Sequence, residues 1–361
     1  AYDGVVNDPY VALRRWIAYR SAQISQAFRA VFTDSAMMNR VRPILASQVG
    51  NANGYLSQGL AWAEGYYGDV TRLWYGGGGA AYYDSTVAPV DLQASTMQGY
   101  FDGLPSARFA QSVAIDTTWA KGYGLKNIAY EGGPGPGGSA LGAITGTHQL
   151  AYTYNADPRM AGRMLAAQGI WEANGGDLLV YYVYSGAPPW SFNDGTRAQT
   201  TSDTTSTKMG VLTQLAGRPQ ATLTLGTGVP GSVYLRSPAA ALQTRIGGDT
   251  TWRYNGTAYR LNANPADLAK SETVLVPIRT TKAGRFALGL TTLDALATDR
   301  LELFVNGRRL GEVSPGTQAA AGQPTATTSL SADLPGGLTV VRVRAKAGSV
   351  WVRDLVVKEG S

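Results

Sequence analysis

The sequence lacks cysteine entirely, which excludes disulfide bonds, thiolate catalysis and cysteine-based metal sites. It has one histidine, His148, so neither a histidine-rich metal centre nor a hydrolase built on several histidines is expected. The glycine- and proline-rich stretch at 132–138 lacks the Lys-Ser/Thr ending of a phosphate-binding loop. Because no cluster of ligand-type side chains stands out, we expect a protein without a metal ion or another cofactor.

Long apolar runs and clusters of one charge are also lacking. No stretch approaches the roughly 20 apolar residues of a membrane-spanning helix. Charged residues make up only 16% of the chain, and the basic excess behind its net charge of +6 is scattered along the sequence. Nucleic-acid-binding arms gather their lysines and arginines in runs. We therefore expect neither a membrane span nor a nucleic-acid partner.

Glycine and aromatic residues, by contrast, are abundant. The 361 residues include 45 Gly, 20 Tyr and 8 Trp, and 44% of them are hydrophobic, which is a globular composition. Such a composition suits a loop-rich all-β or α/β architecture. The flat faces of Tyr and Trp stack on the apolar C–H faces of pyranose rings, so the composition favours carbohydrate as a partner. A purely structural use of these aromatic residues is the competing interpretation.

Residues 1–217 alternate between helical and strand patterns. Apolar residues at helical spacing predict a first helix at 9–32, and their positions are Leu13, Trp16, Ile17, Ile24, Ala27, Phe28 and Val31. Further helices are predicted at 55–73, 106–122, 158–173 and 205–215, and strands at 40–48, 73–83, 125–131 and 177–184. Strands that alternate with helices indicate parallel β/α units. Since only four units are present, we predict half of a (β/α)8 TIM barrel.

Residues 218–361 lose the helical periodicity and adopt the alternation of β-strands. Strands are predicted at 221–225, 232–235, 273–278, 285–290, 300–305, 338–344 and 350–357. Asn306-Gly307 directly follows one of them and is a tight hairpin signal. Seven short strands with turn signals between them predict a β-sandwich, similar to a carbohydrate-binding module. The fold class is therefore α/β plus all-β.

Glu131 is the best candidate for catalysis. It ends a predicted strand in Tyr130-Glu131-Gly132-Gly133, and the active sites of β/α barrels lie at the carboxyl ends of the strands. A carboxylate there, beside glycines that allow a ligand to approach, is a candidate nucleophile or general acid. The competing interpretation is a Glu that caps a loop through backbone amides. Glu64 and Glu172 fall inside predicted helices, where we expect solvated surface groups.

Five further residues are candidates for substrate binding. Tyr82 and Tyr83 end the glycine-rich strand, and Gln48 ends the first one. Trp190 lies on the loop after the strand at 177–184, and His148 follows the Glu131 loop. For Tyr82, Tyr83, Gln48 and Trp190 a structural role is an equal alternative, in the case of the Trp as a plug under the rim. For the lone His148 a hydrogen-bonded loop residue is the more common role, and a substrate contact is the alternative.

Four motifs in succession resemble a known family. They are RVRPILASQ at 40–48, GAAYY at 79–83, GLKNIAYEGG at 124–133 and GGDLLVYY at 175–182. This succession resembles the second half of bacterial cellulose-binding-protein-like members of the clan A glycoside hydrolases, which are retaining β/α-barrel enzymes. The resemblance implies that residues 1–217 are the second half of the (β/α)8 TIM barrel, about strands 5–8. It also implies that Glu131 is the nucleophile, with Tyr82 and Trp190 at the ends of neighbouring strands.

The same resemblance implies a missing carboxylate. In that family the acid/base is a Glu at the end of strand four, usually in an Asn-Glu pair, and this chain contains no Asn-Glu dipeptide. A retaining mechanism needs two carboxyl groups about 5–5.5 Å apart. We therefore expect an N-terminal fragment or a second chain to complete the barrel. The leading hypothesis is a secreted or cell-surface bacterial hydrolase acting on a polysaccharide or oligosaccharide. The alternative is a non-catalytic carbohydrate-binding or structural extracellular protein on the same scaffold.

Overall fold

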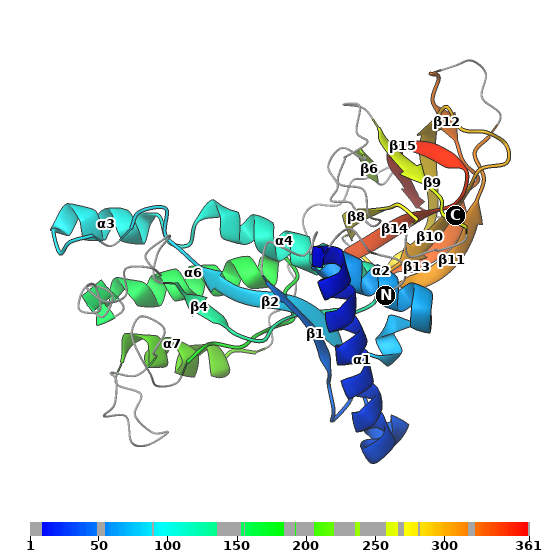
Figure 1. Cartoon of the computed structure of the whole chain (residues 1–361). Helices are drawn as coiled ribbons and strands as arrows, with labels where there is room; N and C mark the ends of the chain where they lie inside the picture. The colour runs from blue at the N-terminus through cyan, green and yellow to red at the C-terminus, as the bar shows by residue number, and fades with distance from the viewer. Residues whose placement is uncertain are drawn as a thin grey trace.

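The computed structural model describes residues 9–48, 55–88, 90–135, 153–154, 156–183, 192, 206–219, 235–238, 258–265, 271–280, 282–316 and 322–359. The chain forms a β/α part followed by a β-sandwich (Figure 1). The elements of the β/α part are α1 (Pro9–Ala36), β1 (Ile44–Gln48), α2 (Leu56–Tyr67), the 3-10 helix η1 (Val70–Arg72), β2 (Gly76–Tyr83), α3 (Ala94–Asp102), α4 (Ala107–Gly122), β3 (Lys126–Ala129), β4 (Gly132–Pro134), α6 (Arg159–Ala173), β5 (Leu178–Leu179) and α7 (Thr207–Ala216).

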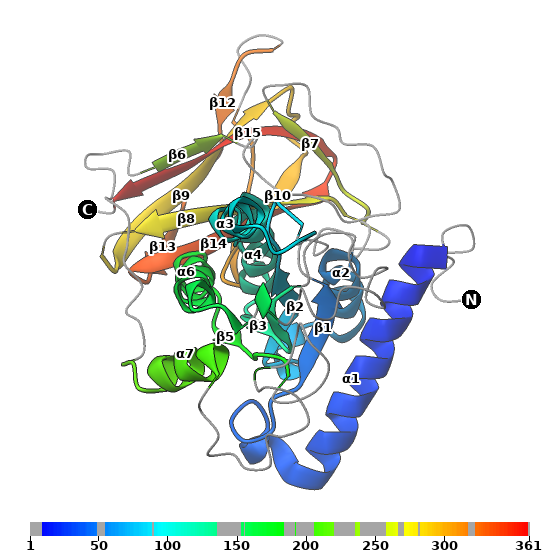
Figure 2. The ribbon, with the colours of Figure 1, turned by 90° about the vertical axis from the view of Figure 1, so that its left-hand side faces the viewer.

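The sheet of the β/α part is parallel and open. Its strand order is β1-β2-β3-β5, with β4 paired to β2 beyond the end of β3, and every pairing is parallel. The helices α1, α2, α4 and α6 arch around one side of this sheet (Figure 2). β1 and β5 are its edge strands. The order confirms the predicted series of parallel β/α units, whereas closure into a barrel stays a prediction.

The glycine run of β2 has a steric cause. β2 lies between β1 and β3, and the side chain of Ile128 on β3 crosses it closely. A Cβ atom added to Gly78 would lie 2.4 Å from the Ile128 carbonyl oxygen, and one on Gly76 would lie 2.6 Å from Ile128 Cδ1. These contacts are shorter than van der Waals packing allows, so glycine is required where the central strand meets β3.

The β-sandwich contains the strands β6 (Leu235–Pro238), β7 (Tyr259–Asn262), β8 (Thr273–Thr280), β9 (Gly284–Leu293), β10 (Arg300–Val305), β11 (Arg308–Val313), β12 (Thr325–Ala326), β13 (Leu330–Leu334), β14 (Gly337–Ala347) and β15 (Ser349–Glu359). One sheet has the order β11-β10-β14-β8 and the other the order β12-β9-β15-β6, with β13 and β7 paired to β9 and β15. All of these pairings are antiparallel. Alternate apolar residues of both sheets form one core, which confirms the predicted sandwich.

The hairpin signal at Asn306-Gly307 is also confirmed. Val305 pairs with Arg308 across a two-residue turn, and both turn residues have positive φ, 46° at Asn306 and 79° at Gly307. A two-residue turn with two positive φ angles matches the twist of the flanking strands. The turn is also a contact point, because a Cβ on Gly307 would lie 2.3 Å from the backbone nitrogen of Gly124, which follows α4.

The sandwich packs on the helices of the β/α part. Leu275 of β8 and Val340 of β14 belong to the same buried cluster as Trp119 and Tyr123 at the end of α4. Helix α2 is buried from Leu56 to Ala63, which its place between the sheet and the sandwich explains. The two parts therefore share a core, and the sheet that contains β8 and β14 has its outer face occupied by α2 and α4.

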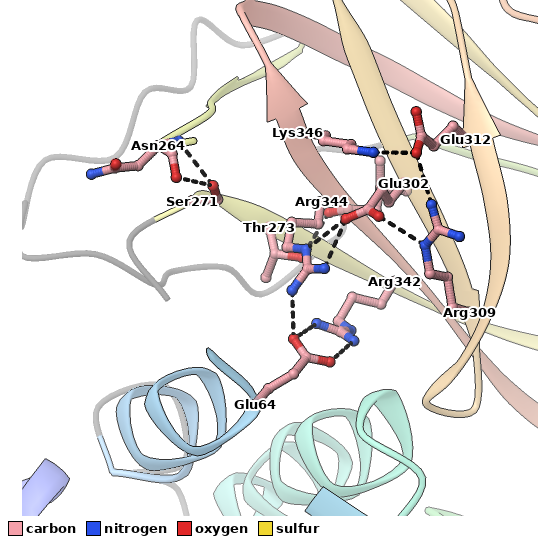
Figure 3. A network of polar contacts seen from close by, with 11 residues as sticks. Glu64, Asn264, Ser271, Thr273, Glu302, Arg309, Glu312, Arg342, Arg344 and Lys346 are labelled. Atoms are coloured by element: carbon pink, nitrogen blue, oxygen red, sulfur yellow. Dashed lines mark hydrogen bonds and ion pairs between the residues drawn. The ribbon is translucent and has the colours of Figure 1, made fainter. Parts of the chain in front are cut away.

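A chain of ion pairs crosses the same interface (Figure 3). Glu64 of α2 accepts hydrogen bonds from Arg342 at 2.6 and 2.9 Å and from Arg344 at 2.7 Å. Arg344 also bonds Glu302, which in turn bonds Arg309. The expectation that Glu64 is a solvated surface group is therefore wrong, because its helix faces the sandwich rather than water.

Two other differences concern the elements themselves. Helix α3 was not predicted, and β5 is two residues long although the apolar run predicts a strand over 177–184. The residues after β5 still form hydrogen bonds with β3 and β4. The Val180 nitrogen donates to the Ala129 carbonyl oxygen at 3.0 Å, and the Tyr182 nitrogen donates to the Gly132 carbonyl oxygen at 2.8 Å. The predicted strand at 221–225 lies outside the described residues. The boundary at 217/218 stays a prediction, one residue past the end of α7.

Candidate functional site

Glu131 stands in a bulge between β3 and β4. On β2, Gly77 pairs with Asn127 and Ala81 pairs with Gly132. Between these two pairings β2 advances by four residues, whereas the segment from β3 to β4 advances by five. The extra residue interrupts the ladder at Tyr130-Glu131, and the Glu131 carbonyl still accepts from the Ala81 nitrogen at 2.8 Å. Bulges commonly re-aim side chains at the ends of strands. This one places Glu131 at the carboxyl end of the parallel sheet, partly exposed.

Tyr82 lies beside Glu131. Its hydroxyl is close enough to the Glu131 carboxylate for the two groups to interact electrostatically. Burial raises the pKa of Tyr82 well above its usual range, and the nearby negative charge of Glu131 raises it further. Tyr82 therefore remains a neutral phenol at physiological pH, with a hydroxyl that can donate a hydrogen bond.

Two more tyrosines flank this pair. The hydroxyl of Tyr130 donates to the Ser47 carbonyl at 3.2 Å, which connects the Glu131 bulge to the end of β1. The ring of Tyr182 meets that of Tyr82 edge to face, with centroids 6.5 Å apart. Both Tyr130 and Tyr182 are exposed, as is Gln48 at the end of β1. The carboxyl ends of the parallel strands thus carry one carboxylate and three tyrosines on one face.

Tyr83 does not lie with these residues. Its side chain is 1% exposed and packs against Phe109 of α4, with ring centroids 5.2 Å apart. The reason is the alternation of side chains along a strand, which sends Tyr82 and Tyr83 to opposite faces of the sheet. The expectation that both line the rim is therefore met by Tyr82 alone. Trp190 and His148 lie outside the described residues.

Sequence reasoning missed Tyr182 as a member of the site. The signal for it was present, since Leu178, Val180 and Tyr182 alternate along one chain segment and are 52%, 43% and 44% exposed. The same alternation that marks a strand also assigns these three residues to a single face. That face is the open one, where Tyr182 meets Tyr82.

The arrangement supplies one half of a two-carboxylate reaction. The Glu131 side chain interacts with Tyr82 and Tyr130, and neither phenol is ionised at physiological pH. Glu131 can act as a nucleophile or as a hydrogen-bond acceptor for a sugar hydroxyl. In the part of the chain that the structure describes, no group of three or more His, Asp or Glu side chains is placed to hold a metal ion. Nor is any described helix long and apolar enough to cross a membrane.

A cavity of about 550 Å³ lies away from this site. It opens between α1 and the start of β1, and its lining is mainly apolar. Trp16, Ile17, Ile24 and Phe28 line it from α1, and Val41 to Ile44 line it from the other side. Glu131 is not part of this lining.

Comparison with known proteins gives structural likeness only. No protein-family model matches the chain, and a search of curated proteins found no match. Among solved structures, a family 35 carbohydrate-binding module from Cellvibrio japonicus is 20% identical over 35% of this chain and 95% of its own, with a TM-score of 0.28. A family 6 module of a laminarinase from Zobellia galactanivorans is 13% identical over 35% of this chain and 98% of its own, with a TM-score of 0.26.

An enzyme with an attached module is among the similar structures as well. It is a β-(1,4)-mannanase from Podospora anserina, 13% identical over 36% of this chain and 28% of its own, with a TM-score of 0.27. These structures are carbohydrate-binding modules or enzymes that contain one. Because every TM-score is low, the likeness carries no argument about function, which has to be made from the residues of the site.

Proposed function

We propose that the protein is a carbohydrate-directed, retaining glycoside hydrolase in which Glu131 is the nucleophile. The observation that carries the proposal is the position of the Glu131 carboxylate beside Tyr82 at the carboxyl end of a parallel β/α sheet. Tyr130 and Tyr182 add exposed aromatic surface beside the carboxylate, of the kind on which a pyranose ring stacks. The substrate class is a polysaccharide or oligosaccharide, and the place of action is outside the cell or on its surface.

The reaction needs a second carboxyl group from outside the described residues. Glu131 attacks the anomeric carbon and forms a glycosyl-enzyme, while the second group protonates the leaving oxygen and later activates water. Tyr82 orients the Glu131 carboxylate for this attack. The exposed apolar side chains of Leu178 and Val180, at the edge strand β5 and just after it, support an outside donor. Parallel sheets are normally covered on both faces.

An activated substrate separates the role of Glu131 from the role of the second acid. In a 2-deoxy-2-fluoro glycoside of dinitrophenol, the leaving group departs without protonation by an acid. Such a compound therefore labels a competent nucleophile even when this chain is alone. We expect one glycosyl adduct by intact mass, located on Glu131 by peptide mapping and abolished by Glu131→Gln. Glu172→Gln, on the helix α6, is the matched control and should leave labelling unchanged. The proposal is refuted if a panel of common fluoro-sugars labels no residue or labels another carboxylate.

A non-catalytic carbohydrate-binding protein is the second candidate. It is favoured by the lone carboxylate and by the exposed rings of Tyr130 and Tyr182. In this case the protein should be retained by an insoluble polysaccharide, and Tyr182→Ala should reduce retention while Glu131→Gln leaves it in place. The sandwich would then serve as a second binding surface or as a brace for the β/α part. Its sheet with β8 and β14 favours the brace, because α2 and α4 occupy the outer face of that sheet.

A further inference from the structure

The outward face of α1 carries a large apolar stripe. The helix faces the protein with small or polar residues, among them Ala18, Ala22 and Ser25. Eight large apolar side chains on its other faces are 39% to 73% exposed: Tyr10, Leu13, Trp16, Ile17, Ile24, Phe28, Val31 and Phe32. With side chains of roughly 150–250 Å² each, the stripe presents on the order of 800 Å², about one partner's share of a standard interface. Monomeric proteins rarely expose so large an apolar patch.

This stripe continues into a groove beside the edge strand β1. The 550 Å³ cavity is bounded on one side by Ile17, Ile24 and Phe28 of α1 and on the other by residues 41–44. β1 pairs with β2 only, so its other edge has backbone groups without a strand partner among the described residues. With α1 on one side and the edge of β1 on the other, this groove can accept one more parallel strand. The side chains of that strand would fill the groove under α1.

Charge indicates the chemistry of the occupant. Residues 9–48 contain six Arg and one Asp, with no Lys or Glu. Arg20 and Arg42 belong to the lining of the groove itself. A second copy of this surface would bring like charges together, whereas a segment with acidic side chains at its margins would complement them. An occupant that is apolar at its centre and acidic at its rim therefore fits this face.

The order of the elements also disfavours a second copy. The β/α part has a helix before its first strand, α1, and another after its last, α7. If two copies closed into one barrel, α1 of one copy and α7 of the other would meet at the same junction between strands. A β/α barrel has one helix for each strand, so a partner for this part has four strands but only three helices.

We propose that the α1 stripe and the free edge of β1 together are the docking site of a β/α segment that lies outside residues 1–361. Its strand pairs in parallel with β1, and the helix before that strand packs on α1 with an acidic rim facing Arg20 and Arg42. This proposal rests on the proposed function in one respect, since it identifies where the carrier of the second carboxyl group binds. It names a surface that can be tested without any measurement of catalysis.

A photo-reactive side chain placed in the groove tests the occupant directly. A benzophenone amino acid is incorporated at position 24, on the stripe, in the full chain produced in its native host. The same probe at position 296, an exposed leucine of the sandwich, is the matched control. After irradiation, we expect an adduct at position 24 only, and mass spectrometry should map it to a β/α-patterned, acidic segment. An adduct between two copies, an adduct with lipid alone, or no adduct at all would overturn the proposal.

Binding of the mapped segment to the purified chain completes the test. We expect a 1:1 complex whose affinity falls at least 100-fold with Ile24→Glu, because a carboxylate would be buried against apolar side chains. Leu296→Glu should leave the affinity unchanged. Since Ile24 is exposed in the free chain, Ile24→Glu should melt at the same temperature as the parent protein. Unchanged affinity of Ile24→Glu contradicts the docking site. Fluoro-sugar labelling of Glu131 in the chain alone reports separately on the proposed function.

Discussion

Removal of the Glu64 carboxylate should destabilise the whole molecule, because it leaves a buried positive charge. Arg342 on β14 has a side chain with no exposed surface, and its guanidinium lies between the rings of Tyr123 and Phe304, 4.1 and 3.8 Å from their centroids. Glu64 is its carboxylate partner and approaches from α2 through two hydrogen bonds. Glu64→Gln preserves the shape of the side chain and removes its charge.

The size of the effect follows from what each arginine keeps. Arg344 retains Glu302 through two hydrogen bonds, so only Arg342 loses its carboxylate. Breaking a buried ion pair from one side costs about 3–5 kcal/mol. Because the side chain of Glu64 is 18% exposed and glutamine still accepts one hydrogen bond, we expect the lower end, about 3 kcal/mol. The urea midpoint should then fall by on the order of 1 M.

The assay is equilibrium unfolding in urea, followed by tryptophan fluorescence and far-ultraviolet circular dichroism. The control is the double replacement Glu64→Leu with Arg342→Met, which removes both charges and should lie within about 1 kcal/mol of the parent protein. Since the pair joins the two parts of the molecule, both probes should report one transition. The reasoning is refuted if Glu64→Gln costs less than about 0.5 kcal/mol, or if the double variant is as unstable as the single one.

Three further predictions concern single positions. Burial raises the pKa of Glu302, but hydrogen bonds from its two arginine partners outweigh burial and leave the pKa below the usual range. Glu302 therefore stabilises the fold above about pH 4.3 and loses this contribution as the pH falls. In Glu302→Gln the urea midpoint should depend less on pH between about pH 5 and 3. Glu131→Gln should lower the pKa of Tyr82, measured by the ¹³Cζ shift of labelled tyrosine, because the nearby negative charge is removed; an unchanged value would contradict their interaction. Both Gly307 and Gly322 have φ near +75°, but only Gly307 touches another part of the backbone. In thermal unfolding, Gly307→Ala should therefore lose at least about 1 kcal/mol more free energy of unfolding than Gly322→Ala, which is about what one strained backbone position costs. Equal losses would contradict the close contact.

The elements of the fold could be predicted where a single periodicity dominates. The alternation over 300–305 followed by Asn306-Gly307 specifies strand and turn together, and both form as expected. The local sequence of a helix does not indicate which other elements the helix packs against. Glu64 lies on a helix whose sequence gives no sign that a sandwich almost 280 residues further on covers it. Long-range packing therefore turned an expected surface group into the centre of an interface.

The candidate site shows the same division. The sequence could place Glu131 and Tyr82 near one edge of the sheet, because each lies near the end of a predicted parallel strand and such ends meet at one edge. Their roles in a site stay predictions. Whether Tyr82 or Tyr83 faces that edge depends on the phase of β2. Four glycines precede the pair, and glycine carries no side chain that could reveal the phase. Only the register with β4, where Tyr82 pairs with Gly133, settles which tyrosine meets the carboxylate.

Helix α1 shows that a pattern can record a contact that the described chain does not itself make. Its apolar spacing predicted an amphipathic helix, and the helix forms, but Ile17, Ile24 and Phe28 face outward over a groove instead of into the core. Periodicity reports that a helix has an apolar face and is silent about what covers it. The same holds for Leu178 and Val180, which are exposed at the opposite edge of the sheet. Among the described residues, neither β1 nor β5 has a strand partner on its outer edge, and both edges carry exposed apolar side chains. The proposed β/α segment would account for these features together, and it would also bring the second carboxyl group to Glu131.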